Sequence, residues 1–376
     1  MIKTITVFTI GDSRKMTTWS GIPYFLAHQL ELEGIKVHRV NIAPNRYLNW
    51  LYKHSIFRML QKIHPGSEYD YIKSYIHRFL MFFKVLFFQI LYREADVDLL
   101  LTYSTDIIYR KNRTVMLSDW TLVQYIKNQL KRSLYSEEQN YYNYQLRCMK
   151  RVKHIISLFP LSATYLSSEL GREVKCLGSN VVNNCYEGNV TTELVEKKYK
   201  TQRILFIGRS AYAKGAQLLL ESFINLQKTF PKLELHYVGI TSSTLKLTEV
   251  PMNVFFHGYL RKETEKDRRL YYELMTEATL FVNPTQEWGG YSSTIEAMYF
   301  YTPVVVAPYN EFVSEFGDSI KFGKYIDEFS SDKLLRILKG ILNSSRKEYL
   351  EMSVAAHQNV ENHTWQRFIY ALLNIL

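Results

Sequence analysis

Short apolar runs alternate along the chain with longer segments in which apolar residues recur every three or four positions. The first of these units predicts a strand at residues 5–10, a helix at 21–32 and a second strand after Gly34. Further strands are predicted at 98–103, 114–119, 154–158 and 174–178, with long helical material at 124–153. Strands that alternate with helices form parallel sheets with crossover helices, so the first half predicts an α/β domain.

A second series of the same kind follows, with strands predicted at 203–209, 233–239, 254–258, 280–284 and 303–307. Residues 180–202 lie between the two series, and their Asn, Thr, Lys and Glu without a sustained apolar period predict a linker. We therefore expect two α/β domains, 1–185 and 186–355, with a last helix at about 356–376 that joins the first. Two open sheets that face each other form a cleft at the carboxyl ends of their strands, where ligands of this fold class bind.

The first candidate site follows the strand that ends at Ile207. Gly208 lets the backbone turn tightly as it leaves the sheet, and Arg209 and Lys214 stand at the strand end and beside the next helix. Two fixed cations near the positive end of a helix can hold a diphosphate and stabilise the charge that grows on a leaving phosphate. The alternative is that both are solvated loop residues.

The second candidate site is a glycine loop between a strand and a helix. Its paired glycines allow a ligand to approach the backbone, a serine can cap the helix, and one glutamate is expected in the first helical turn. A carboxylate accepts two hydrogen bonds from neighbouring hydroxyls of a ribose or hexose ring. Glu296 as a residue that only faces the helix dipole is the alternative. The candidates are Glu287, Gly289, Gly290, Ser292 and Glu296.

Positive charge is concentrated in the first half of the chain. Residues 1–185 contain 25 Lys and Arg against 14 Asp and Glu, whereas 186–376 contain 22 of each, so the first half carries the whole net charge of +11. This asymmetry indicates an anionic partner such as a lipid surface or a phosphorylated acceptor, and no recognised motif supports nucleic acid. On a helix at 73–92, Lys73, His77 and Lys84 fall within about 40° of each other. They are candidates for membrane contact, with core packing of this helix as the alternative.

The chain begins with a strand-like pattern rather than a signal peptide, and its three cysteines show no metal-ligand spacing. The longest apolar run, 79–91, is shorter than the roughly 20 residues that a bilayer span requires. We therefore expect a cytoplasmic protein, with peripheral association at the inner face of the membrane as an extension of that expectation.

Residues 200–320 resemble the donor domain of the retaining family-4 glycosyltransferases, which are glycosyl transferases group 1. The matching motifs, in order, are Gly208-Arg209, Lys214-Gly215, Glu287 through Gly290, Glu296-Ala-Met298 and Thr302-Pro-Val-Val305. The resemblance implies the GT-B fold, two Rossmann-like α/β domains that face each other across a cleft. It also implies that Arg209 and Lys214 bind the donor diphosphate, Glu287 the sugar hydroxyls and Glu296 the ribose. Eight residues separate the two glutamates where the family usually has seven, so the loop must bulge if both roles are kept.

The resemblance extends to the first half through Gly21, which matches a glycine that lies against the donor phosphates. Ser118 and Asp119 stand where many members carry a histidine, and both are candidates for contact with the sugar or acceptor. A helix-capping role is the alternative for Asp119. We expect no metal at Asp96-Val-Asp98, because these residues precede an apolar strand and because the fold that the chain resembles neutralises the diphosphate with Arg and Lys.

The sequence therefore predicts a metal-independent glycosyltransferase without a cofactor, which moves a hexose-type sugar from a nucleotide-sugar to a lipid-linked or cell-surface saccharide. Another GT-B enzyme, either a nucleotide-sugar epimerase or a glycogen-type phosphorylase or synthase, is the nearest alternative. A non-catalytic sugar- or membrane-binding module of the same fold is an alternative from another class.

Overall fold

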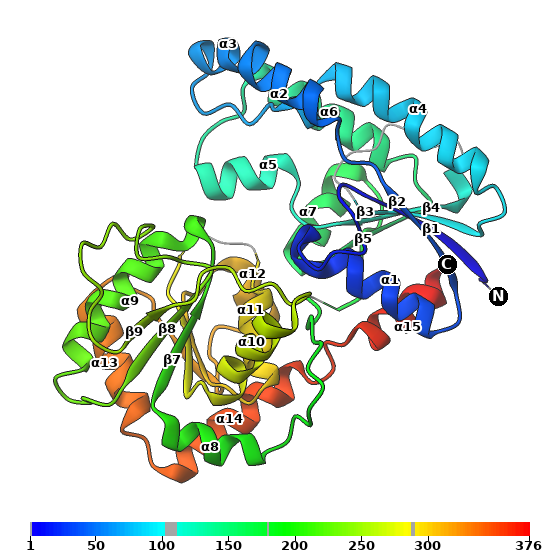
Figure 1. Ribbon diagram of the computed structural model, residues 1–376. Helices are drawn as coiled ribbons and strands as arrows, with labels where there is room; N and C mark the ends of the chain where they lie inside the picture. The colour runs from blue at the N-terminus through cyan, green and yellow to red at the C-terminus, as the bar shows by residue number, and fades with distance from the viewer. Residues whose placement is uncertain (1, 102–110, 179, 287–289) are drawn as a thin grey trace. The chain divides into compact units, whose positions relative to one another are not determined.

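The computed structural model describes residues 2–101, 111–178, 180–286 and 290–376. The contacts within the chain divide it into two compact units (Figure 1). Unit 1 comprises Met1–Ser179 and Trp365–Leu376, and unit 2 comprises Asn180–Thr364. The division falls at residues 180 and 365, whereas the sequence pattern places it at 186 and about 356.

Unit 1 contains a six-stranded parallel sheet in the order β2-β1-β3-β4-β5-β6. β1 pairs with β2 on one side and β3 on the other, so Val7 lies between Arg39 and Leu99. The middle strands β3 and β4 are buried on both faces, which explains why most of their residues are apolar. The strands are β1 Thr4–Thr9, β2 Lys36–Asn41, β3 Val97–Leu101, β4 Thr114–Ser118, β5 His154–Ser157 and β6 Lys175–Cys176.

Helices cover the sheet of unit 1, and its last helix comes from the far end of the sequence. α15 packs against α1, which connects β1 to β2 (Figure 1). The helices are α1 Ile22–Leu32, α2 Arg46–His54, α3 Ile56–Ile63, α4 Tyr75–Leu91, α5 Leu122–Tyr125, α6 Ser136–Met149, α7 Pro160–Leu170 and α15 Trp365–Ile375. Shorter turns are η1 Thr18–Gly21, η2 Tyr71–Lys73, η3 Lys111–Arg113 and the π-helical η4 Ile126–Leu130.

Unit 2 contains a second six-stranded parallel sheet, in the order β12-β11-β10-β7-β8-β9. The chain starts in the middle at β7, runs outward to β9, and returns to the other side at β10. The strand order therefore reverses between β7 and β10, and open α/β sheets bind ligands outside the carboxyl ends of the strands at such a point. The strands are β7 Arg203–Ile207, β8 Glu234–Val238, β9 Val254–Phe256, β10 Leu280–Asn283, β11 Val304–Val306 and β12 Gly323–Tyr325.

The helices of unit 2 pack on both faces of its sheet (Figure 1). α9 and α13 pack together on one face, where Leu219, Phe223, Leu334 and Leu338 are buried in one cluster. These apolar residues recur at three- and four-residue spacing, so burial of one helix face explains why both segments are helical. The helices are α8 Glu193–Thr201, α9 Ala213–Leu226, α10 Glu265–Glu277, α11 Ser292–Tyr299, α12 Asn310–Phe316, α13 Ser331–Leu342 and α14 Arg346–Val360, with the turn η5 Ser210–Tyr212.

The predicted linker at 180–202 is in part a helix. α8 occupies Glu193–Thr201 and packs on α10, because Lys198 is fully buried and donates hydrogen bonds to the carbonyl of Ala278 (3.2 Å) and the hydroxyl of Thr302 (2.8 Å). Burial lowers the pKa of Lys198. A lysine usually indicates a surface residue, so the burial of Lys198 was not apparent from the sequence. This explains why residues 180–202 were predicted to be a linker.

The long helix predicted at 124–153 is interrupted. Lys131 adopts a left-handed backbone conformation (φ 50°) at the end of η4, and α6 starts again at Ser136. The carboxylate of Glu138, which is fully buried, accepts hydrogen bonds from Arg132 (2.7 Å) and from the backbone amide of Tyr135 (2.9 Å). This charge-assisted contact holds the chain in a sharp turn where the polar pattern alone is compatible with a continuous helix.

Candidate active site

Three adjacent strands of unit 2 are followed by glycines at their carboxyl ends. The amide of Gly208 after β7 donates to Val238 (3.0 Å), and the amide of Gly239 after β8 donates to Gly258 after β9 (2.6 Å). Gly239 has a φ of +84°, and a Cβ there would lie 2.5 Å from the carbonyl oxygen of Gly208. Only glycine tolerates both the backbone conformation and this close approach. The loops therefore lie close to the sheet edge at Gly208, as the sequence predicts, and also at two glycines that the sequence analysis did not select.

Arg209 lies directly beyond this edge. It has an extended backbone (φ −93°, ψ −177°) and precedes the turn η5. Its side chain is exposed, and its guanidinium carbon lies 5.3 Å from the centre of the Tyr259 ring. Tyr259 immediately follows Gly258, so a residue at the end of the third strand stacks with the cation at the end of the first. No motif in the sequence pointed to Tyr259.

Lys214 is the second residue of α9, and its side chain is exposed. The next residue, Gly215, is buried, and a Cβ there would lie 2.3 Å from the hydroxyl oxygen of Thr285. Gly215 therefore allows the first turn of α9 to pack directly against the loop that follows β10. This places Lys214 at the reversal of strand order between β7 and β10. Within the described parts of the chain, neither Arg209 nor Lys214 forms an ion pair.

Glu296 is buried on α11 and held by two donors. Its Oε2 accepts hydrogen bonds from the Lys262 ammonium (2.7 Å) and the Tyr271 hydroxyl (2.6 Å), while its Oε1 lies 3.4 Å from the Ser292 hydroxyl. Lys262 also donates to the carbonyl of Asn183 (3.2 Å). Burial and the charge of Glu296 raise the pKa of Tyr271, which keeps its hydroxyl protonated as a donor. One carboxylate oxygen is thus fixed, and the other retains capacity to accept a hydrogen bond from a ligand.

Two expectations about the start of α11 are wrong. Ser292 is its first residue rather than its N-cap, and the N-cap, Tyr291, makes no side-chain capping bond. Glu296 consequently lies in the second turn, where it points inward to Lys262 and Tyr271 instead of interacting with the helix dipole. Lys262 lies in the loop after β9, so sequence proximity gave no signal for this pair.

The remaining residues of the glycine loop are placed only in part. Gly290 is half-buried and directly precedes Tyr291, the N-cap of α11. Glu287 and Gly289, which the sequence analysis selected for the sugar and the donor, lie outside the described residues. The extra residue between Glu287 and Glu296 is expected to bulge within residues 288–291, of which Gly290 and Tyr291 are described.

In unit 1, Gly21 is the N-cap of α1 in a left-handed conformation (φ 86°), as expected for a glycine at this helix start. The two residues before it, Trp19 and Ser20, also have positive φ values of 42° and 55°. The Trp19 indole Nε1 donates to the Asp119 carboxylate (3.1 Å), which ties the loop after β1 to the loop after β4. This contact was not anticipated.

Ser118 is buried at the end of β4, and its hydroxyl donates to the carbonyl of Asp119 (3.2 Å). Asp119 does not cap the following helix. Thr121 caps α5 and forms a reciprocal capping box with Gln124. The helix-capping interpretation of Asp119 is therefore wrong, and its carboxylate instead orients Trp19.

The two aspartates of the Asp-x-Asp pair have other partners. Asp96 Oδ2 accepts from the backbone amides of Lys3 (2.8 Å) and Thr4 (3.0 Å), which lowers its pKa. Asp98 belongs to the strand, in agreement with the strand predicted at 98–103 but not with the expectation that both aspartates precede it. It is buried within β3, where Gln89 donates to its carboxylate (2.9 Å). In the described parts of the chain, His, Cys, Asp and Glu side chains do not gather in groups of three that could hold a metal ion.

Of the three residues predicted to contact a membrane, His77 is buried, and Lys73 and Lys84 are only partly exposed. Lys73 pairs with Asp70 (3.1 Å), and its side chain is 17% exposed. His77 is buried against Tyr71, and burial lowers its pKa. Lys84 is half-buried, and burial lowers its pKa also.

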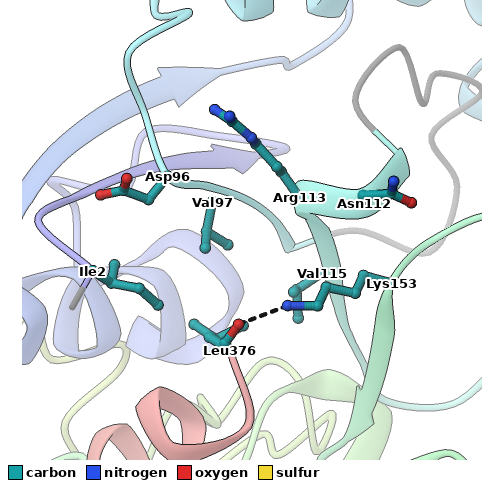
Figure 2. A pocket seen from close by; sticks show the side chains of 8 residues that line it. All are labelled: Ile2, Asp96, Val97, Asn112, Arg113, Val115, Lys153 and Leu376. Carbon is teal, nitrogen blue, oxygen red and sulfur yellow. Dashed lines mark hydrogen bonds between the residues drawn. The ribbon is translucent and has the colours of Figure 1, made fainter.

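A pocket in unit 1 lies at the opposite edge of its sheet (Figure 2). Asp96, Arg113 and Lys153 line it near the amino ends of β3, β4 and β5, and Lys153 donates to the main-chain oxygen of Leu376 (2.6 Å). Ligands of open α/β sheets bind at the carboxyl ends of the strands, so we assign this pocket no part in the chemistry.

Comparison with known proteins supports the resemblance of unit 2 to a glycosyltransferase domain. Residues 201–337 match the family model described as "Glycosyl transferases group 1". This match contains Gly208, Arg209, Lys214, Lys262 and Glu296. No curated protein shows a significant sequence match.

Solved glycosyltransferase structures share the fold at low sequence identity. HepE from Anabaena, in complex with UDP and glucose, is 14% identical with a TM-score of 0.62, and the match covers 100% of both chains. WaaG, a glycosyltransferase involved in lipopolysaccharide biosynthesis, is 14% identical with a TM-score of 0.60, and the match covers 98% of this chain and 99% of WaaG.

A mutant of S. aureus TarM, in complex with UDP and two saccharide ligands, is 16% identical with a TM-score of 0.55. The match covers 74% of this chain and 55% of TarM, so the chain spans little more than half the length of that protein. The resemblance to glycosyl transferases group 1 is thus confirmed over residues 201–337, within a chain that has the two-domain α/β fold of the GT-B glycosyltransferases.

Proposed function

We propose that the protein is a retaining, metal-independent glycosyltransferase of family 4, which moves a hexose-type sugar from a nucleotide-sugar to a lipid-linked or cell-surface saccharide. One observation carries the proposal. Arg209 and Lys214 are exposed at the point where the strand order of unit 2 reverses, and within the described residues no carboxylate neutralises them. Two unneutralised cations at this point suit a diphosphate.

The proposed reaction forms a bond between the acceptor oxygen and the anomeric carbon of the sugar. The bond between that carbon and the diphosphate oxygen breaks, and the diphosphate leaves with the bonding electron pair. The acceptor hydroxyl attacks on the same face and gives its proton to the departing phosphate. Arg209 and Lys214 stabilise the negative charge that develops there, more strongly in the transition state than in the ground state.

Glu296 is proposed to bind the ribose of the donor through Oε1, because Lys262 and Tyr271 already occupy Oε2. A fixed carboxylate loses little freedom when it accepts a hydroxyl, which favours binding. Glu287 keeps its proposed contact with the sugar hydroxyls. Gly21 is proposed to lie against the donor phosphates, and Gly289 and Gly290 are proposed to let the donor approach the backbone. Ser118 and Asp119 remain proposed contacts to the sugar or acceptor.

The names of the similar structures support the choice of substrates. HepE contains UDP and glucose, TarM contains UDP and α-GlcNAc-glycerol, and WaaG is involved in lipopolysaccharide biosynthesis. These are nucleotide and saccharide ligands of the kinds proposed here. We further propose that the protein acts in the cytoplasm, at the inner face of the membrane.

The proposal is tested by thermal unfolding with a panel of nucleotide-sugars and nucleoside diphosphates. A ligand at 100 times its dissociation constant stabilises the native state by about 2.7 kcal/mol and raises Tm. We expect one nucleotide class to raise Tm of the wild type and of Lys228→Ala, which changes a lysine beyond the other end of α9. The same ligand should give a much smaller rise in Lys214→Ala. No response to any nucleotide would contradict the proposal.

An activity assay separates the proposed reaction from those of other GT-B enzymes. We expect the donor to be consumed only when a saccharide acceptor is present, at a rate that EDTA does not change. Epimerisation of the donor, or phosphorolysis of a glycan, would replace the proposed reaction with one of the alternatives.

A further inference from the structure

α4 presents its apolar residues to solvent and its polar residues to the interior. Its nine exposed side chains are all aliphatic or aromatic, whereas His77, Arg78 and Gln89 are buried. At 100° per residue the exposed side chains occupy about half of the circumference and the buried ones the other side. The exposed residues are Tyr75, Ile76, Phe79, Leu80, Phe82, Phe83, Phe87, Ile90 and Leu91. This orientation is the reverse of that on a helix that covers a soluble core.

α2 and α3 extend this apolar surface. Tyr71 of η2 packs against Tyr52 of α2 and His77 of α4, so the inner faces of the two helices share one core. Their outer faces lie along the same side of unit 1 (Figure 1). The exposed apolar residues here are Tyr47, Trp50, Leu51, Ile56, Met59 and Ile63. Three helices thus carry 15 of the 26 large apolar side chains exposed in the described structure, a concentration that soluble surfaces rarely show.

The charges next to these apolar residues have one sign. Four exposed basic residues on α2 and α3 form no ion pair within the described structure, namely Arg46, Lys53, Arg58 and Lys62. Between residues 34 and 93 the acidic residues are Glu68 and Asp70, and Asp70 is bound by Lys73. On α3, Arg58 and Lys62 project to one side of the exposed stripe of Met59 and Ile63, at about 60° to 140° from these two residues. A helix that lies in a membrane interface has this arrangement of apolar residues beside cations.

We propose that the outer face of α2, α3 and α4 docks on a bilayer that contains anionic phospholipids. Tyr75 and the exposed phenylalanines of α4 enter the boundary between headgroups and acyl chains, with Trp50 of α2 at the same depth. The four basic side chains contact the lipid phosphates. Lys73, His77 and Lys84 take no part, because they face the protein.

Charge favours a bilayer over a second copy of the chain. Two copies that met through this face would bring eight unpaired cations together with few carboxylates to neutralise them. An anionic lipid surface neutralises the same cations while it buries the apolar residues. The helices of the described structure are too short or too polar to cross a bilayer, and α4 has 17 residues, so the contact is one of docking.

Flotation of the full chain with lipid vesicles tests the inference, and the test does not require nucleotide-sugar turnover. We expect the wild type to float with vesicles of phosphatidylcholine and phosphatidylglycerol, and much less with phosphatidylcholine alone. The variant Phe79→Ser/Phe83→Ser/Phe87→Ser should lose most of this binding. The variant Arg46→Gln/Lys53→Gln/Arg58→Gln/Lys62→Gln should bind the anionic vesicles at least about tenfold more weakly. Each cation near an anionic surface raises the affinity about fivefold.

The matched control removes exposed apolar residues from unit 2 in the variant Val250→Ser/Met252→Ser/Phe329→Ser, which should float like the wild type. All the changed side chains are exposed, so circular dichroism should show an unaltered fold in each variant. Equal flotation of the wild type and the phenylalanine variant would overturn the inference. So would a wild type that stays with neither kind of vesicle but forms dimers, by light scattering, that the phenylalanine variant does not form.

Discussion

The carboxyl edges of the two sheets are built from similar elements but use their polar residues differently. In unit 2, Arg209 and Lys214 are exposed and have no carboxylate partner in the described structure. In unit 1, Trp19 donates to Asp119, and the hydroxyl of Ser162 donates to the Asp119 carbonyl (2.9 Å). One edge leaves charge for a ligand, and the other joins its own loops. The shared fold therefore does not decide which edge carries the chemistry; the contacts of the loop residues do.

The difference between the two sheet edges is tested most directly by a change at Lys214. We expect Lys214→Ala to lower kcat/KM by 10²–10³-fold, roughly 3–4 kcal/mol, because a preorganised cation at a developing charge is removed. The free energy of unfolding should stay within about 0.5 kcal/mol of the wild type, since the side chain is exposed. Steady-state kinetics and urea unfolding measure both quantities, with Lys228→Ala as the control. An unchanged kcat/KM would remove Lys214 from the proposed site.

A second test concerns the partner of Glu296. Lys262→Met leaves a buried carboxylate without its cation, so we expect a loss of roughly 2 kcal/mol in the free energy of unfolding and a raised KM for the donor. Lys262→Met/Glu296→Gln removes the charge from both partners and should recover part of the stability but not the KM. Equal stability of the single and double variants would show that the ion pair does not hold Glu296 in place.

A change at Asp119 in unit 1 should reduce the free energy of unfolding by less than the change at Lys262 does. Asp119→Ala removes the acceptor of the Trp19 indole, and we expect a loss of about 1 kcal/mol in the free energy of unfolding. Asp119→Asn keeps an oxygen acceptor and should lose less. If Asp119 contacts only Trp19, both variants keep the wild-type KM for the acceptor, whereas a raised KM in Asp119→Asn supports the proposed contact to the sugar or acceptor.

The smallest expected effect is a change in the stability of unit 2 with pH, through His257 at the edge of its sheet. Burial, with the nearby His236 and Arg203, lowers the pKa of His257 from 6.5 to about 4. The native state therefore favours neutral His257, and its contribution to stability is complete above pH 6.5 and is lost as pH falls towards 4. His236 Nδ1 lies 3.0 Å from His257 Nε2, and its pKa is also lowered by burial.

Because His257 is half-exposed, solvent screening reduces the expected loss to roughly 1 kcal/mol. Urea unfolding at pH 7.5 and pH 5 measures it, and His257→Asn should reduce the difference between the two pH values. A variant with the same pH dependence as the wild type would show that His257 does not contribute.

The sequence predicted the α/β fold with two sheets, because strands buried on both faces are continuous apolar runs and glycines mark their ends. It also placed Gly208, Arg209 and Lys214 correctly, because local order fixes the end of β7 and the start of α9. Contacts between distant residues were missed. Lys262 is far from its partner Glu296 in the sequence, and Trp19 is far from its partner Asp119.

The exposed face of α4 was missed for a different reason. Helical periodicity identifies two faces of a helix but not which face is exposed. Lys73, His77 and Lys84 were proposed as membrane contacts because they fall within about 40° of each other on the predicted helix. In the structure the polar side of α4 packs against Tyr71 and Tyr144. His77 contacts the ring of Tyr71, and the Arg78 guanidinium lies 4.0 Å from the centre of the Tyr144 ring.

The packing of α15 on α1 has a consequence for biosynthesis. All of unit 2 lies between these helices in the sequence, so their contact closes a loop that contains an entire folded unit. The sheet of unit 1 leaves the ribosome first, yet its last helix is translated only after unit 2. Unit 2 is continuous and can fold as soon as it emerges, whereas the part of α1 that contacts α15 stays uncovered until α15 is translated. A folded unit 2 then shortens the effective loop that α15 has to close.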